Sequence, residues 1–135
     1  MLTLSALAAL AAAHADELDQ PVAPLRIGAK EYDTDTRPVI MGTVNLSRDS
    51  TYRESVAIHG DSAIRKARIM AAQGAHFIDI GAESSTAKAA RVTADDQIAA
   101  LVPVIEQLIA DGIDVSAETY EPKVVRACLQ AGARC

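Results

Sequence analysis

Three polar side chains occupy equivalent places in this sequence, each at or near the end of a short apolar run. They are Asn45, Glu83 and Glu118. Their amide and carboxylate oxygens can accept hydrogen bonds, bind a divalent cation or transfer a proton. The runs recur at a spacing of about 37 residues, so the same local structure is expected three times. The runs cover residues 39–45, 77–83 and 113–119.

The runs have the length and composition of buried parallel strands. They alternate with polar loops and helical patterns, which is the order typical of an α/β fold. The carboxyl ends of parallel strands meet at one edge of a sheet, where α/β proteins bind their ligands. The sequence therefore predicts that Asn45, Glu83 and Glu118 lie at one edge. The predicted strands are 39–44, 76–81 and 113–118.

Each predicted strand is followed by an amphipathic helix with recognisable ends. The first helix is expected to begin near Asp61 and to end at Gly74. Thr93 can cap the second, in which Pro103 is expected to cause a kink or a restart. Pro122 suits the first turn of the third. The predicted inward-facing residues are Ala63, Ala67, Met70 and Ala71, then Ile98, Leu101, Val102, Ile105, Leu108 and Ile109, then Val124, Val125, Cys128 and Leu129.

The first 37 residues form a separate predicted segment. An Ala- and Leu-rich helix is expected over 2–18, followed by a linker and a small hairpin over 25–32. The helix is too short to span a bilayer, and no basic residue precedes it as in a secretory signal. We therefore expect a cytoplasmic protein with an N-terminal segment, 1–37, and a main domain, 38–135.

Composition limits the classes of function. Half of the 135 residues are hydrophobic but only 3% are aromatic, so the core must be aliphatic. A net charge of −5 gives no general attraction for nucleic acid or anionic lipid, and neither partner is expected. Cys128 and Cys135 form no metal-binding or redox motif. Three histidines, His14, His59 and His76, have no spacing suited to a metal site and are expected to be structural or exposed.

Three βα units are fewer than half of those in a (β/α)8 barrel, which typically needs about 250 residues. A three-stranded parallel sheet would also leave two open edges. We therefore expect an α/β chain that forms the first three βα units of a partial (β/α)8 TIM barrel. A free-standing three-stranded domain is the alternative.

Three blocks of the sequence resemble the dihydropteroate synthase family. The block 40–50 resembles the family's "MGILNVTPDS", the block 74–85 resembles "GADIIDIGGEST", and the block 115–123 resembles "ISVDTYKPE". Their order and spacing also fit, over about residues 38–135. Three ordered blocks are far more specific than a single motif.

The resemblance implies a barrel that binds a pterin in its mouth. The implied reaction joins a dihydropterin diphosphate to p-aminobenzoate, releases pyrophosphate and yields dihydropteroate for folate synthesis. Mg²⁺ is implied as the cofactor that assists departure of the pyrophosphate. The implied partners are the two small-molecule substrates and either a second copy, in a homodimer, or a polypeptide that supplies the C-terminal half of the barrel.

Residue by residue, the resemblance implies roles for five positions. Asn45 matches the Asn that contacts magnesium and the diphosphate, which makes it a catalytic and metal-binding candidate. Asp49 and Ser50 match the mobile first loop that closes over the substrate, and are also catalytic candidates. Ser85 matches the Thr that lines the pterin and diphosphate site, and Glu118 matches the Asp that hydrogen-bonds the pterin ring.

The chain departs from the family pattern at several of these places. Ser47 and Arg48 replace a Thr-Pro pair, and Arg48 is a candidate substrate-binding residue because it lies in the signature loop. Residues 85–88, Ser-Thr-Ala-Lys, replace the "TRPG" of the second loop, so its Arg and Pro are absent. Glu118 is one methylene longer than the family's Asp, and about 1 Å of misplacement in such a site can cost about a hundredfold in rate. These changes leave a catalytically altered pterin-binding homologue as an alternative.

The same residues allow other functional interpretations. Glu83 and Glu118 could form the acid and base of a glycosidase, but the chain has no Trp and a single Phe for a sugar platform. A pterin-dependent methyltransferase usually has Asn after the Asp of its second strand, whereas Ile80 follows Asp79 here. Asp79 itself is either a structural carboxylate of the barrel interior or a functional one. Glu83 is expected to hydrogen-bond neighbouring residues, and Arg91 to be exposed.

Overall fold

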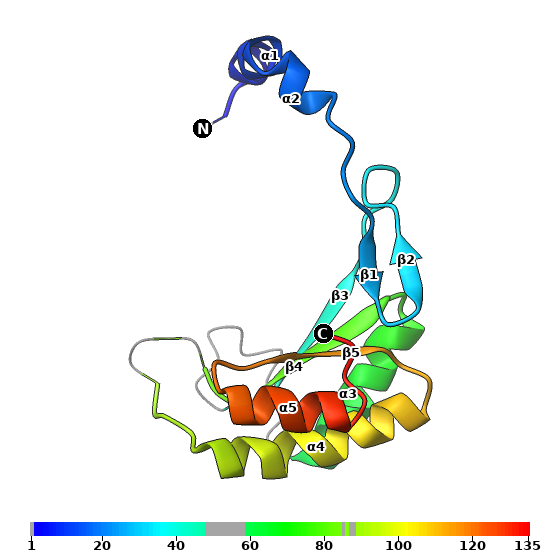
Figure 1. The fold of residues 1–135 in the computed structure, drawn as a ribbon, viewed down its shortest axis with the longest axis vertical. Helices are drawn as coiled ribbons and strands as arrows, with labels where there is room; N and C mark the ends of the chain where they lie inside the picture. Colours follow the sequence, from blue (N-terminus) through cyan, green and yellow to red (C-terminus); the bar gives the residue numbers. More distant parts are fainter. Residues whose placement is uncertain (1, 48–58, 85, 87–88) are drawn as a thin grey trace.

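The computed structural model describes residues 2–47, 59–84, 86 and 89–135 (Figure 1). A hairpin precedes three alternating strand–helix units, as the sequence predicts, and two helices take the place of the single helix expected over 2–18. The elements in chain order are α1 (Leu4–Ala13), α2 (Ala15–Leu18), β1 (Leu25–Ile27), β2 (Lys30–Tyr32), β3 (Met41–Asn45), α3 (Gly60–Ala72), β4 (Phe77–Gly81), α4 (Ala94–Ala110), β5 (Val115–Glu118) and α5 (Pro122–Gln130).

The main sheet has the order β3-β4-β5, and both strand pairs are parallel. The strands follow one another in sequential order. Right-handed crossovers between such strands place the helices that follow them, α3, α4 and α5, on one face of the sheet, as in a barrel. Accordingly α3 packs on β3 and β4, α4 packs on β5, and α4 lies between α3 and α5 (Figure 1). The predicted α/β class and the partial barrel arrangement are confirmed.

The core lies between the sheet and the helices and is aliphatic, as the composition predicts. Val44, Ile78, Ile80 and Val115 are completely buried on the helix-facing side of the sheet. Since successive side chains of a strand point to opposite faces, the residues between them face the other way. That second face carries the candidate site.

The helices correct three details of the sequence analysis. Pro103 lies inside α4 and does not end it, because Pro103 and Ala99, the residue whose carbonyl loses a donor, are both on the exposed face. Val125 and Leu129 of α5 are exposed, whereas Val124 and Cys128 are buried.

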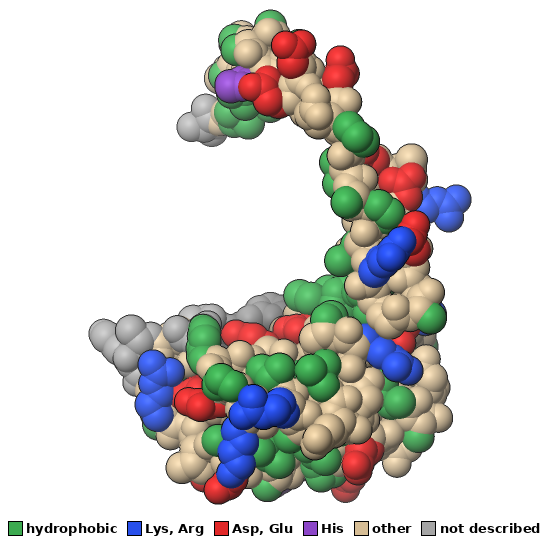
Figure 2. Space-filling view, viewed as in Figure 1, with side chains coloured by type: hydrophobic (Ala, Val, Ile, Leu, Met, Phe, Trp, Pro, Cys, Tyr) green, Lys and Arg blue, Asp and Glu red, His purple; other side chains and the backbone are tan. Residues whose placement is uncertain are grey.

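The N-terminal helix is not continuous over 2–18. It breaks at His14, where φ is −127° and ψ is 36°, and neither α1 nor α2 has a buried residue. An Ala- and Leu-rich helix without a polar face has no single side to pack, and these helices stand away from the sheet (Figures 1 and 2). None of the helices in the described part of the chain has the length and apolar character needed to traverse a bilayer.

The hairpin of β1 and β2 packs against the amino ends of the main strands. Ile27 is buried, and the ring of Tyr32 meets His76 edge-on, with 5.5 Å between ring centroids. Lys30 Nζ lies 2.7 Å from Asp114 Oδ2, just before β5. His76 Nδ1 accepts the Ile40 N–H at 3.0 Å, so this histidine is structural. The hairpin therefore covers the end of the sheet opposite to the candidate site.

The residues after Gly132 lie beside β5, where a fourth strand of the sheet would be. The Arg134 N–H donates to the Val115 carbonyl at 2.7 Å, and the Ala117 N–H donates to the Cys135 carbonyl at 2.9 Å. The outer edge of β5, expected from the sequence to be open, is therefore paired along part of its length.

Candidate functional site

Asn45 and Glu118 are the last residues of β3 and β5, the two outer strands, and lie at the same edge of the sheet. Asn45 is paired with Gly81 of β4, and Gly81 is paired with Glu118 of β5. Adjacent strands are about 4.8 Å apart, so the Cα atoms of Asn45 and Glu118 are separated by about 10 Å across the carboxyl ends of three strands. The sequence prediction that these two side chains share one edge is confirmed by the register.

A second polar row lies one step below, on the same face. Thr43, Asp79 and Ser116 are paired across the three strands in the same way. Ser116 Oγ donates a hydrogen bond to Asp79 Oδ1 at 2.5 Å. The half-buried Asp79 carboxylate is therefore held by a neighbouring strand, and it forms the floor beneath the row of strand ends.

The Glu118 side chain folds over the end of β4. Its Oε2 is 3.0 Å from the position that a β-carbon on Gly81 would occupy, so the carboxylate fills the space that Gly81 leaves. Burial, and to a lesser extent the charge of Asp79, raise the pKa of the Glu118 carboxyl above its ordinary value of 4.5. A carboxyl placed in this way can exchange a proton or accept hydrogen bonds from a ligand at the strand ends.

Glu83 is the centre of a hydrogen-bond network behind the site. It is only 8% exposed, and its Oε1 accepts from Arg91 Nη1 at 3.2 Å and from the Val92 N–H at 3.4 Å. Its Oε2 accepts from Gln97 Nε2 at 3.1 Å. The expected hydrogen-bonding role of Glu83 is borne out, and the exposed Arg91 side chain pairs with it from the solvent side.

The loop after β4 continues with a compact turn. Ser84 Oγ and Thr86 Oγ1 are 2.7 Å apart, and the Thr86 N–H donates to Ser84 Oγ at 3.3 Å. Ser85 lies outside the described residues. Arg48, Asp49 and Ser50 also lie outside them, so their predicted roles stay predictions.

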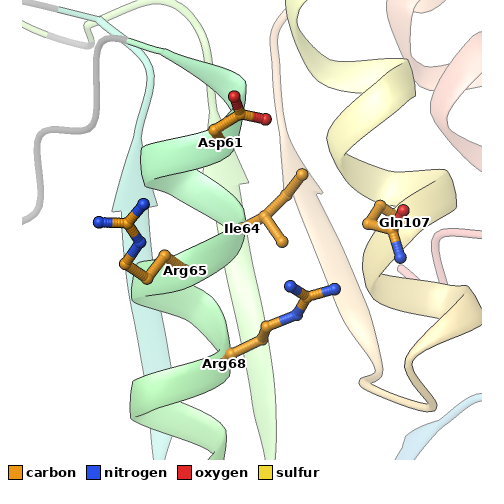
Figure 3. Close-up of a pocket in the computed structure, with 5 residues that line it drawn as sticks. All are labelled: Asp61, Ile64, Arg65, Arg68 and Gln107. Carbon is orange, nitrogen blue, oxygen red and sulfur yellow. The ribbon is translucent and has the colours of Figure 1, made fainter.

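A groove on the opposite side of the sheet is separate from this site. It lies between α3 and α4 and is lined by two arginines, of which Arg68 points toward α4 and Arg65 away from it (Figure 3). Arg68 Nη2 pairs with Asp111 Oδ2 at 2.7 Å. The groove belongs to the helical layer, and the strand ends do not contribute to it. Its remaining lining residues are Asp61, Ile64 and Gln107.

Oxygen ligands for a cation are few in the described part of the chain. No group of three or more His, Cys, Asp or Glu residues there could hold a metal ion. A Mg²⁺ ion usually takes one or two protein oxygens and completes its shell with water and substrate phosphates. The Asn45 amide oxygen at the mouth of the site fits a ligand of that kind.

A family model described as "Pterin binding enzyme" matches residues 41–135. The chain belongs to the pterin-binding enzyme family. The matched part contains β3, β4 and β5 and with them every residue of the site described above.

The relatives and solved structures to which this chain is similar agree with the family. The chain is 40% identical over 94 residues to dihydropteroate synthase type-2 of Escherichia coli, which covers 70% of this chain and 35% of that protein. It is 34% identical over 110 residues to the dihydropteroate synthase of Clostridium beijerinckii, covering 81% of this chain and 41% of that one. The chain thus spans about two fifths of the length of these relatives.

Two crystal structures show the same arrangement. Burkholderia cenocepacia dihydropteroate synthase complexed with 7,8-dihydropteroate has a TM-score of 0.69 and 37% identity, over 83% of this chain and 36% of that one. Xanthomonas albilineans dihydropteroate synthase with 4-aminobenzoic acid has a TM-score of 0.70 and 32% identity, over 84% of this chain and 42% of that one. The partial barrel of this chain therefore matches part of the fold of these synthases.

Sequence reasoning missed two members of the site's surroundings. Gln97 is completely buried on α4 and Thr119 follows β5, and a hydrogen bond joins them. The available signal was a single polar residue one turn before Leu101 in an otherwise apolar helix stripe.

Proposed function

We propose that this chain forms the pterin-binding part of a dihydropteroate synthase. In the proposed reaction the amine of p-aminobenzoate attacks the methylene carbon of a dihydropterin diphosphate. A C–N bond forms, the C–O bond to the diphosphate breaks, and pyrophosphate leaves. The observation that carries the proposal is the row of Asn45, Gly81 and Glu118 across three parallel strand ends, within the segment that matches the family.

The chemistry of the row suits a flat nitrogen heterocycle. The Glu118 carboxylate lies over Gly81 at the strand ends, where it can accept hydrogen bonds from ring and exocyclic N–H groups. Asp79, held by Ser116, provides a polar floor below. The relatives bound to 7,8-dihydropteroate and to 4-aminobenzoic acid support the same class of ligand here.

The diphosphate end of the substrate is assigned to the side of Asn45. Its amide oxygen would hold Mg²⁺, which when bound neutralises charge on the departing pyrophosphate. Arg48, Asp49 and Ser50 follow Asn45 in the chain and are proposed to close over the diphosphate. Ser85 is proposed to line the pterin and diphosphate site from the second loop. Hydroxyl, amide and guanidinium groups are suitable donors for phosphate oxygens.

The cellular compartment, the domain division and the oligomeric assembly are also part of the proposal. The two free thiols, Cys128 and Cys135, suit a reducing cytoplasm. The division into an N-terminal segment, 1–37, and a barrel domain, 38–135, is proposed because the family match begins at 41. A homodimer, or a partner that completes the barrel, would supply the remaining part of the site.

Binding of dihydropterin diphosphate to the full chain tests the proposal. We expect calorimetry to detect binding that requires Mg²⁺ and is weakened by Glu118→Ala. Glu106→Ala, an exposed carboxylate on α4, is the matched control and should leave binding unchanged. Dihydropteroate formation is then measured after addition of p-aminobenzoate. Absence of pterin binding by a folded chain would overturn the proposal.

A catalytically altered homologue is the second candidate. The specific observation in its favour is that the longer Glu118 side chain folds back over Gly81. In that case the chain would bind the pterin but form no dihydropteroate when p-aminobenzoate and the missing part of the barrel are supplied.

A further inference from the structure

Gln97 lies between the two loops that follow β4 and β5, and it is hydrogen-bonded to both. We propose that Gln97 is a positioning residue that couples these loops, so that the strand ends they continue keep a fixed spacing. The link to a pterin ligand rests on the proposed function, whereas the coupling itself does not. The carrying observation is one fully buried amide that joins Glu83 of the first loop to Thr119 of the second.

The amide of Gln97 has its hydrogen-bonding capacity filled on both sides. Its Nε2 donates to Glu83 Oε2 at 3.1 Å and to the Val92 carbonyl at 3.0 Å, which uses both of its hydrogens. Its Oε1 accepts from Thr119 Oγ1 at 3.0 Å. Reversing the amide would turn its oxygen toward a carboxylate and a carbonyl, so only one orientation is compatible with these neighbours.

On one side, the network closes the loop after β4 at its base. Glu83 begins this loop, and its Oε1 accepts from Arg91 and from the Val92 N–H at the loop's other end. The carboxylate of Glu83 therefore ties the beginning of this loop to its end. Gln97 holds the other oxygen of the same carboxylate and fixes its direction.

On the other side, the network reaches the residue next to Glu118. Thr119 Oγ1 donates to Gln97 and accepts from the Glu121 N–H at 3.2 Å, just before α5. Thr119 and Gln97 thus each accept from one neighbour and donate to the next, and the Glu83 carboxylate ends the series as an acceptor. Hydrogen bonds in such a series polarise one another and stabilise a single arrangement when they are buried.

The burial of Gln97 and Glu83 makes their hydrogen bonds interdependent. A buried polar group that loses its partner keeps the full cost of its desolvation. Removal of the Thr119 hydroxyl therefore leaves the Gln97 oxygen unpaired inside the protein, and the amide can recover solvent only if it moves from Glu83. A change in one loop is therefore expected to loosen the other loop, because Gln97 is bonded to both.

Amide hydrogen exchange in the full chain tests this coupling without any ligand. Thr119→Val keeps the side-chain shape and removes only the hydroxyl. We expect it to raise the exchange rate of the Val92 amide about fivefold, although Val92 is bonded to Glu83 and not to Thr119. Glu83→Gln should reciprocally raise the exchange rate of the Glu121 amide, because coupling between two sites is mutual. The double variant should give less than the product of the two single effects.

Matched variants separate coupling from general destabilisation. Thr36→Val removes a hydroxyl that bonds only to the nearby Asp33, and it should leave the Val92 exchange rate unchanged. Gln97→Met and Gln107→Met make the same change on the same helix, and only the first should release both loops. If Gln97→Met does not fold, the milder Thr119→Val still decides. Independent, multiplicative effects of Glu83→Gln and Thr119→Val would overturn the inference.

Pterin binding gives a separate outcome. With dihydropterin diphosphate as the probe, Thr119→Val should weaken calorimetric binding about tenfold while the exchange of core amides such as that of Ile80 stays unchanged. If the unmodified chain binds no pterin but the loops remain coupled, the proposed function fails and the positioning role of Gln97 stands. If pterin binds equally well to Thr119→Val and the loops exchange independently, the positioning role fails and the proposed function stands.

Discussion

The carboxylate of Glu118 lies over the α-carbon of Gly81, with Oε2 3.0 Å from the place of a β-carbon at that position. Gly81 is in turn the register partner of Asn45, so the longer acid at position 118 and the missing side chain at 81 share the centre of the strand-end row. The two residues are matched in size, and their relationship can be tested by changing both.

Gly81→Ala is expected to displace the Glu118 carboxylate and leave the fold intact. The contacting atom is the far end of a flexible side chain, so the strand need not move. The carboxylate must move by a few tenths of an ångström. We expect pterin affinity to fall about tenfold, which is less than the roughly hundredfold loss that accompanies 1 Å of misplacement. Glu118→Asp in the same chain withdraws the clashing oxygen and should restore part of the affinity. Calorimetry on the four chains measures this, and a double variant no better than Gly81→Ala would contradict the pairing.

The raised pKa of Glu118 predicts a pH-dependent contribution to stability. A carboxyl whose pKa is higher in the folded than in the unfolded chain holds its proton more tightly when folded. Its contribution is therefore most favourable below the ordinary glutamate pKa and is lost as pH rises through the folded value. Relative to Glu118→Gln, the unmodified chain should lose stability as pH rises above the ordinary glutamate pKa of 4.5. Urea unfolding at a series of pH values tests this, and parallel curves for the two chains would exclude it.

Gly42→Ala is expected to destabilise the core by overpacking. An added β-carbon would lie 2.7 Å from Ile78 Cδ1 and 3.2 Å from Met70 Cβ, on the side of β3 that faces α3. Overpacking of this kind costs about 1–3 kcal/mol of unfolding free energy. Ile78→Val removes the nearest atom, so the double variant should recover part of the loss despite the cost of Ile78→Val alone. Chemical denaturation of the four chains measures the effect, and strictly additive losses would show that the two positions do not compete for space.

The sequence was sufficient to predict the three strands of the main sheet and the edge at which their carboxyl ends meet. Apolar runs containing Val44, Ile78 and Val115 allowed few other assignments, and sequential parallel strands can only place Asn45 and Glu118 at one end. The aliphatic core followed from composition. The family resemblance also came from the sequence, since its three blocks lie on β3, β4 and β5 with their loops.

The details that failed depend on tertiary packing. The apolar residues of α4 permit two neighbouring stripes, and the structure buries Val104, which the sequence analysis did not select. Gln97 was overlooked because the helix pattern counts only apolar residues, whereas this amide is buried through its bonds to other segments. The break at His14 could not be read from the sequence because an Ala- and Leu-rich helix has no stripe to fix its ends.

The hairpin contact at the opposite end of the sheet gives a last prediction, in which burial decides between two ion pairs. Lys30 meets Asp114 at 2.7 Å, and the Asp114 side chain is only 14% exposed. Arg26 meets Glu31 at 2.8 Å within the hairpin, but both side chains are largely exposed. Exposed pairs contribute about 0–1 kcal/mol, whereas loss of one partner of a shielded pair leaves a charge with reduced hydration.

Asp114→Ala should therefore reduce the free energy of unfolding by roughly 1–2 kcal/mol and expose the hairpin. Glu31→Ala is the matched control, since it removes a carboxylate that also pairs with a hairpin cation, and its effect should be within about 0.5 kcal/mol. Limited proteolysis between β2 and β3 reports the release of the hairpin directly. Equal sensitivity of the two variants to protease would mean that the apolar contacts of Ile27 and Tyr32, and not the Lys30–Asp114 pair, hold the hairpin on the sheet.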